Sequence, residues 1–171
     1  MAVVYLGIGS NLGDRKVNID KALMFLEEKK DIKVKAISNL IETAPQEGAC
    51  LPQWQGPPQG DFLNAAARIE TDLLPLELLS RLKAVERRLG RVKAEPNFPR
   101  PIDLDILFYD DVVIVEGKNL CIPHPRLAER EFVLRPLKEI APALVHPRLK
   151  KDVTALYQEL LHAGHPEPRQ T

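Results

Sequence analysis

Two kinds of apolar pattern alternate along this chain of 171 residues, and their order restricts the fold. A period-two pattern, typical of strands, is followed by a helical pattern and a second strand pattern, and the same order then repeats. A repeated strand–helix–strand unit is typical of the split βαβ arrangement, so we expect an α+β protein with a ferredoxin-like core. An added β-hairpin strand and C-terminal helices should follow. The strand patterns cover 2–8, 32–43, 62–71, 102–108 and 112–115, and the helical patterns cover 16–30, 75–89, 123–135 and 154–162.

The composition favours one compact domain over residues 1–171, with a loose tail at about 164–171. Lys plus Arg and Asp plus Glu both number 24, so no global charge points to nucleic acid or to a membrane surface. No apolar run approaches the ~20 residues of a membrane span, and the first residues do not read as a signal peptide. Two cysteines without metal-ligand spacing favour a reducing cytoplasm. We expect a cytoplasmic monomer that binds small molecules.

An acidic pair lies in the last strand of the repeated unit. Alternation places Ile102, Leu104, Ile106 and Phe108 on one face, and Asp103 and Asp105 on the other. Two carboxylates one pleat apart repel each other, and a divalent cation relieves that repulsion. Magnesium takes one or two protein carboxylates and keeps its other positions for water and phosphates. The pair therefore predicts a metal–phosphate site, with ordinary acids on a half-solvated edge strand as the alternative.

The glycines after the first strand superficially resemble a dinucleotide-binding loop. Leu12 stands where the third Gly of that motif is required, and no phosphate loop ending in Gly-Lys-Ser or Gly-Lys-Thr is present. The segment is better interpreted as a strand-to-helix turn with Asp14 near the N-cap. The first and last strands of a split βαβ unit lie close together, so the turn at Gly9 and the acidic pair are expected to border one cleft.

Other residues are placed to complete such a cleft. Phe62 and Asn64 share one strand face, where they would stack a flat heterocycle and hydrogen-bond its edge, or simply pack at a strand end. Glu86 lies at the border of a buried helical stripe, as a flanking charge or as a group turned into a site. The long loop 44–60 would close over a ligand with Trp54, or form an insertion with a partly exposed Trp.

Cations gather in sequence around the acidic pair, and transfer of a phosphoryl group requires metal ions, cations and accurate placement of the acceptor. Taken singly, each of these cations is ordinary surface charge, and only the cluster favours a phosphate site. An Arg fork holds phosphate oxygens bidentately, whereas Lys acts as a point charge. The cluster consists of Arg91, Lys93, Arg100, His124, Arg126 and Arg130.

Five short motifs occur in an order that resembles one enzyme family. They are Ile8-Gly9-Ser10-Asn11-Leu12, Phe62-Leu63-Asn64-Ala65-Ala66, Glu86 with Gly90-Arg91, Pro99-Arg100-Pro101-Ile102-Asp103-Leu104-Asp105-Ile106, and Pro123-His124-Pro125 with Arg130-Glu131-Phe132-Val133-Leu134. The chain resembles 6-hydroxymethyl-7,8-dihydropterin pyrophosphokinases of folate biosynthesis over roughly residues 2–145. The fourth motif is the most diagnostic.

The resemblance implies a reaction and a set of roles. The pterin hydroxymethyl oxygen would attack the β-phosphorus of ATP, so that pyrophosphate is transferred and AMP leaves. Asp103 and Asp105 would hold two Mg²⁺ ions and, with Arg91 and Arg100, form the catalytic set. ATP would be bound by Glu86, Arg91, Lys93, Arg100, His124 and Arg130, and the pterin by Thr43, Pro45, Phe62, Asn64 and Phe132. No residue is identified as a general base, since a metal-bound hydroxyl is already acidified.

The chain departs from the family pattern in the loop before Arg100. Glu95-Pro96-Asn97-Phe98 is shorter than a common family form that carries a Trp there, and Lys93 stands where an Arg is frequent.

Two alternative functions agree with part of the sequence. A nucleotidyl or sugar transferase would also use Asp-x-Asp, but lacks support from the pterin-side residues. A ferredoxin-like RNA-binding module would need a basic face and aromatics on its central strands, and the zero net charge and acidic pair oppose it.

Overall fold

A computed structural model describes residues 1–45, 59–92 and 98–164, and its sheet has the strand order β2-β4-β1-β5. All the pairings are antiparallel, and the first strand β1 lies between β4 and β5. This order confirms the ferredoxin-like prediction, including the contact between the first and last core strands. The elements are β1 Ala2–Ser10, α1 Arg15–Glu27, β2 Ile32–Ile37, β3 Ile41–Thr43, β4 Phe62–Thr71, α2 Pro75–Arg88, β5 Asp103–Tyr109, β6 Ile114–Glu116, β7 Leu120–Ile122, a 3-10 turn Leu127–Glu129, α3 Glu131–Ile140 and α4 Val153–Ala163.

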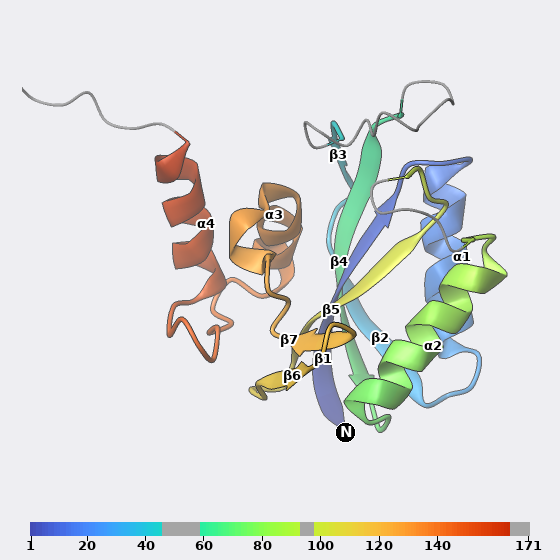
Figure 1. The fold of residues 1–171 in the computed structure, drawn as a ribbon, viewed down its shortest axis with the longest axis horizontal. Helices are drawn as coiled ribbons and strands as arrows, with labels where there is room; N and C mark the ends of the chain where they lie inside the picture. Colours follow the sequence, from blue (N-terminus) through green and yellow to red (C-terminus); the bar gives the residue numbers. More distant parts are fainter. Residues whose placement is uncertain (46–58, 93–97, 165–171) are drawn as a thin grey trace, which may run out of the picture.

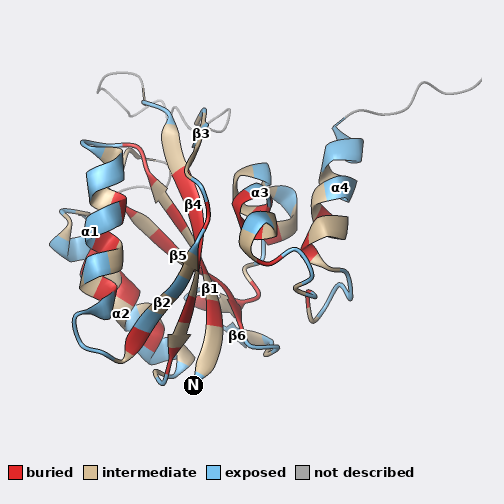
Figure 2. Cartoon of the chain, turned by 180° about the vertical axis from the view of Figure 1, so that it is seen from behind, coloured by how far each residue is buried: buried red, intermediate tan, exposed pale blue. Residues whose placement is uncertain are grey.

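Helices cover both faces of the sheet (Figure 1). Helices α1 and α2 pack on one face around Leu6, Ile19 and Leu82, and α3 packs on the other face with α4 outside it. Buried positions follow the strands and the inner sides of the helices (Figure 2). The second core includes Ala66 and Leu134. No helix of the described chain is long and apolar enough to cross a membrane.

A β-bulge in β5 changes which face its last residues occupy. Tyr5 pairs with Phe108 whereas the next residue, Leu6, pairs with Ile106, so Leu107 is an extra residue in β5. The predicted alternation therefore holds as far as Leu107, which shares the face of Asp105. The prediction that Phe108 shares the face of Ile106 is wrong, because the bulge places Phe108 on the α3 side together with Leu107.

Two further predictions are corrected. The strand expected at 32–43 is divided into β2 and β3, since Ser38 leaves the ladder and its hydroxyl accepts the Ala66 N–H at 2.9 Å. The expected hairpin strand at 112–115 does not return along β5. Instead β6 pairs with β7 in a separate two-stranded sheet.

Capping and turn chemistry fix the ends of the helices. The Asp14 carboxylate accepts the Val17 N–H at 3.1 Å, which confirms the predicted N-cap of α1. Helix α2 is followed by Gly90 at φ +93°, a conformation that only glycine adopts without strain.

The segment after β7 is attached to the bulge of β5. The His124 N–H donates to the Leu107 carbonyl at 3.0 Å, which holds residues 123–130 beside this bulge.

Candidate active site

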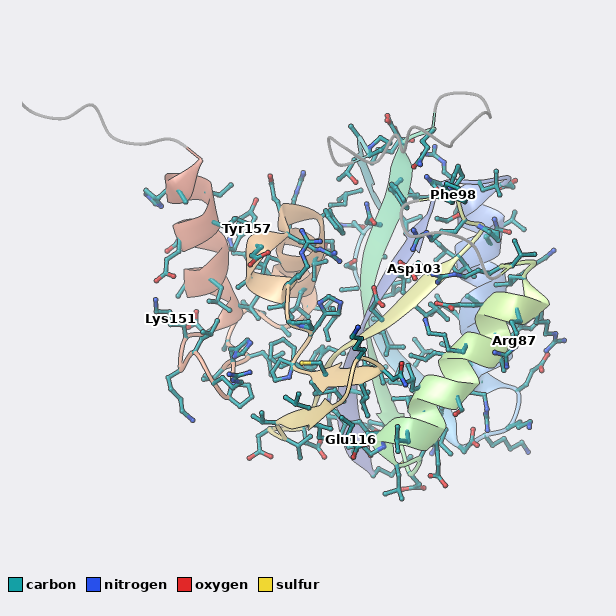
Figure 3. The ribbon with its side chains drawn as sticks, viewed as in Figure 1. Arg87, Phe98, Asp103, Glu116, Lys151 and Tyr157 are labelled. Atoms are coloured by element: carbon teal, nitrogen blue, oxygen red, sulfur yellow. The ribbon has the colours of Figure 1, made fainter. Side chains whose placement is uncertain are left out.

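A pocket lies on the α3 side of the sheet, where the strand ends of β1, β4 and β5 meet. Asp103 is the first residue of β5 (Figure 3). It is one of the residues that line this pocket. The predicted proximity of the Gly9 turn and the acidic pair is confirmed, because Gly9 pairs with Asp103 across β1 and β5. The residues that line the pocket are Gly7, Ile8, Gly9, Thr43, Ala44, Gln59, Phe62, Asn64, Ala65, Arg100, Asp103, Asp105, Leu107, His124, Arg130, Phe132 and Val133.

The two aspartates differ in their surroundings. Arg91 Nη1 lies 2.5 Å from Asp103 Oδ1, and Arg100 Nη1 lies 3.3 Å from Asp103 Oδ2. No described residue forms an ion pair with Asp105. The acids therefore share one strand face, as alternation predicts, but among the described residues only Asp103 is neutralised by arginines.

This difference separates the acidities of the two carboxyls. Burial alone would raise the pKa of Asp103, but Arg100 and Arg91 hold it below its usual range. Burial raises the pKa of Asp105 to about 7, and the charge of Asp103 adds to this effect. A cation bound between the two carboxylates would relieve the cost of holding Asp105 ionised at neutral pH.

Glu86 connects α2 to β5 and does not line the pocket. Its side chain is 3% exposed, and its Oε1 accepts the Leu104 N–H at 2.8 Å on the outer edge of β5. Lys83 Nζ lies 3.0 Å from Oε2, and Arg91 Nη1 lies 2.8 Å from Oε1. Glu86 thus positions the strand between the two aspartates and holds Arg91 against Asp103.

Arg100 is held by the backbone of Phe98 and by Asn11, which follows β1. Its N–H donates to Asn11 Oδ1 at 2.8 Å, and its Nε donates to the Phe98 carbonyl at 3.2 Å. Only 19% of its side chain is exposed. These contacts direct the guanidinium at Asp103 in the wall of the pocket.

Two more basic side chains line the opposite wall. Arg130 lies just before α3, and its Nε is buried without a partner among the described residues. Burial, helped by the charge of Arg130, lowers the pKa of His124 to about 4, so that His124 is neutral at physiological pH. An unpartnered guanidinium nitrogen beside a neutral imidazole suits an anion that also offers hydrogen-bond acceptors.

A less polar end of the pocket lies between β4 and α3. Asn64 is buried, and its Nδ2 donates to Thr43 Oγ1 at 2.6 Å. Phe62 and Phe132 line the same pocket from β4 and α3. A polar amide and two aromatic side chains in one pocket can hold a flat heterocycle and hydrogen-bond its edge.

The pocket brings together most of the predicted residues from distant parts of the chain. Pro45 does not line it, although Ala44 does, and Arg91 reaches it only through Asp103. Lys93, Trp54 and the expected tail beyond Gly164 lie outside the described residues. Sequence reasoning missed Gly7, Leu107, Asn11 and Lys83. The prediction that the turn begins at Gly9 is wrong, because β1 continues to Ser10. The spacing of two residues between Gly7 and Gly9 indicates that they share one face of this strand.

The fold and the site together define a class of protein. A pair of acids, a set of cations and two aromatic rings around one pocket suit a transferase that moves a phosphate-bearing group onto a flat acceptor.

The chain belongs to the 7,8-dihydro-6-hydroxymethylpterin-pyrophosphokinase family, whose model matches residues 5–142. It is 44% identical over 151 residues to the 2-amino-4-hydroxy-6-hydroxymethyldihydropteridine pyrophosphokinase of Aquifex aeolicus, which is 88% of each chain. It is 43% identical over 145 residues to a folic acid synthesis protein of Schizosaccharomyces pombe, but these residues make up only 19% of that protein. Members of this family are ATP-dependent diphosphotransferases of folate biosynthesis, and this chain is an enzyme of that kind.

Solved structures support the fold. The crystal structure of an HPPK-DHPS protein in complex with substrates matches 99% of this chain with a TM-score of 0.75 at 18% identity. A Plasmodium falciparum HPPK-DHPS structure matches 98% with a TM-score of 0.70 at 19% identity. The chain covers 45% of each of these proteins. At such identities the likeness establishes the shared ferredoxin-like architecture.

Proposed function

We propose that this chain transfers pyrophosphate from ATP to the hydroxymethyl group of 6-hydroxymethyl-7,8-dihydropterin at the pocket between β5 and α3. The observation that carries this location is that Asp103 and Asp105 line the same pocket as Asn64 and Phe132. The first two suit a metal–triphosphate group and the last two suit a flat acceptor. The hydroxymethyl oxygen forms a bond to the β-phosphorus as the bond to the α-phosphate oxygen breaks, and AMP leaves.

The acidic pair fits Mg²⁺ by its donor chemistry. Carboxylate oxygens are hard ligands, and magnesium uses few of them. In residues 1–45, 59–92 and 98–164, no group of three or more His, Cys, Asp or Glu side chains is placed to hold a metal. Coordination by Asp103 and Asp105 would therefore leave positions for water and phosphate. We assign two ions to this pair, and bound magnesium would acidify the attacking hydroxyl and stabilise charge on the triphosphate.

The cations around the pocket would bind the nucleotide. Arg100 and Arg130 face the acids from opposite walls and are placed to hold phosphate oxygens. Neutral His124 offers a hydrogen bond, while Glu86 contributes through its hold on Arg91. Lys93 stays in the proposed set on the resemblance alone.

Pterin binding is assigned to the apolar end of the pocket. With its Nδ2 engaged by Thr43, Asn64 keeps Oδ1 as an acceptor for a ring N–H. Phe62 and Phe132 would enclose the ring, and Thr43 and Pro45 would form the wall through backbone groups. We further propose a cytoplasmic, monomeric, single-domain enzyme that requires no nucleic acid or membrane.

One assay tests the reaction. The protein is incubated with Mg²⁺, ATP and reduced hydroxymethylpterin, and the nucleotide products are separated. AMP and the pterin pyrophosphate should form in equal amounts. Formation of ADP, or of a nucleotidyl adduct with free pyrophosphate, would replace this proposal with a different transferase.

Removing Arg91 should strengthen the binding of free metal, even though it weakens catalysis. Arg91 Nη1 lies 2.5 Å from Asp103 Oδ1, so a cation must displace it to reach that oxygen. We expect Arg91→Ala to raise the affinity for Mn²⁺ without nucleotide by about tenfold. Electron paramagnetic resonance of free Mn²⁺ measures this directly.

Arg87→Ala is the matched control for this experiment. Arg87 lies four residues before Arg91 in the sequence but is exposed on α2, away from Asp103 (Figure 3). Its loss should leave Mn²⁺ affinity unchanged. If Arg91→Ala bound Mn²⁺ no better than Arg87→Ala, the inference that Arg91 and the metal compete for Asp103 would be wrong.

A further inference from the structure

We propose that Gly9 determines acceptor specificity, an inference that rests on the proposed function of Asn64. Because Gly9 has no side chain, Asn64 has the space that it needs to form a hydrogen bond with the edge of the pterin ring. Gly9 on β1 and Asn64 on β4 are direct partners in the antiparallel register. A Cβ on Gly9 would lie 3.2 Å from Asn64 Oδ1 and 3.7 Å from Phe62 Cδ1. The first contact is tighter than most such contacts in proteins, so one of the two groups would have to shift.

The backbone does not require glycine at this position. Gly9 is within a strand, and the glycines with positive φ are Gly13, Gly90 and Gly117 among the described residues. An alanine would adopt the same extended conformation without strain. The need for glycine at position 9 is therefore a need for space above the sheet, where the pocket floor lies.

Asn64 has little freedom to move away from an added methyl group. Its Nδ2 is tied to Thr43 Oγ1 at 2.6 Å on the far side, and the residue is only 5% exposed. The amide is thus confined between Gly9 on β1 and Thr43 on β3. A methyl group at position 9 would turn the amide or break its bond to Thr43, and either change would misplace the Oδ1 acceptor.

The effect should be confined to the acceptor. Although Gly9 pairs with Asp103, the heavy atoms within 4 Å of a Cβ at position 9 belong to Asn64 and Phe62. The side chains proposed to bind ATP and metal are therefore not displaced. Loss of pterin affinity with unchanged ATP affinity is a signature that general damage to the fold would not produce.

Gly7 provides a matched control on the same strand and the same face. A Cβ there would lie 3.3 Å from Leu107 Cδ2, the end of a flexible apolar side chain. Leu107 is buried but purely apolar, so a small shift of its side chain breaks no hydrogen bond, whereas a shift of Asn64 breaks its bond to Thr43. Both glycines line the pocket, so the comparison separates the contact with Asn64 from simple filling of the pocket.

The experiment measures pterin binding by fluorescence titration in the presence of Mg²⁺ and a non-hydrolysable ATP analogue, with nucleotide binding measured separately by calorimetry. Gly9→Ala should weaken pterin binding by about tenfold or more, because a site built to hydrogen-bond its ligand loses much when that group is misplaced. Nucleotide affinity should stay within about twofold, and Gly7→Ala should cost less than about threefold. Wild-type pterin affinity in Gly9→Ala, or an equal loss of both ligands, would overturn the inference. Failure of the wild-type protein to bind the pterin would instead overturn the proposed function.

A double-mutant cycle with Asn64→Ala tests the route of the effect. Asn64→Ala removes the atom that the new methyl group would contact, so adding Gly9→Ala should cause less than about a twofold further loss. Losses that multiply would show that position 9 acts without Asn64 and would refute its positioning role. If Gly9→Ala alone failed to fold, the double variant should fold, and its failure would also refute the contact.

Discussion

Replacing Asp105 by Asn should abolish most of the turnover and, at the same time, make the ligand-free protein more stable. The amide cannot supply the charge that a magnesium ion requires, so we expect kcat to fall by about a thousandfold or more. The expected gain in stability has a separate origin, the cost of burying the Asp105 charge beside Asp103. Steady-state kinetics and thermal unfolding of one purified variant measure both effects.

The sign of the stability effect follows from the acidity of Asp105. Burial and the neighbouring Asp103 raise its pKa to about 7 from 3.8 in the unfolded chain. Between these values the native state binds more protons than the unfolded state, so this group lowers stability as pH rises. An Asn has no proton to lose and avoids that penalty. The Tm advantage of Asp105→Asn should therefore be small at pH 4 and reach about 3 °C or more at pH 8.

Asp103→Asn is the matched control, because it removes the other acid of the same strand face. The pKa of Asp103 is held low by Arg100 and Arg91 against the effect of burial, so its charge stabilises the native state at neutral pH. Asp103→Asn should lose activity as Asp105→Asn does, but should lower Tm at pH 8. Equal Tm changes in the two variants would contradict the assigned difference in environment. Retention of a large part of the turnover by Asp105→Asn would refute the metal assignment.

Local patterns in the sequence predicted the fold and the orientation of the acids. The apolar alternation of Leu104 and Ile106 places Asp103 and Asp105 towards the pocket because side chains in a regular strand alternate strictly. The same rule failed at Phe108, where the bulge inserts Leu107. A bulge depends on how the partner strand pairs, and period-two spacing carries no sign of it.

Local patterns in the sequence could not predict the contacts between residues within the site. Asn11 holds Arg100 across 89 positions of sequence, and Glu86 reaches the Leu104 amide from α2. The sequence pattern places Glu86 at the border of a buried helical stripe, and this position gives no indication of a partner on an edge strand. Such contacts depend on tertiary packing, so only the family resemblance connected these residues beforehand.

Arg100→Ala should slow the chemical step more than it weakens ATP binding. Arg100 lies at the pocket with its guanidinium 3.3 Å from Asp103, where it can meet the negative charge that grows on the triphosphate as the bond to AMP breaks. A cation that meets developing charge stabilises the transition state more than the ground state, so kcat should fall by about a hundredfold or more.

Arg126 supplies a control cation for Arg100 from the same part of the sequence. It is exposed, pairs with Glu129 at 3.5 Å and does not line the pocket, so Arg126→Ala should retain both kcat and ATP affinity. Single-turnover kinetics at saturating ATP isolate the chemical step for Arg100→Ala, and calorimetry measures nucleotide affinity. A loss confined to ATP affinity would mean that Arg100 binds the ground state and transition state equally. In that case the charge that develops during transfer would have to be met by Arg130 or by the metal ions, and the catalytic role given to Arg100 would be wrong.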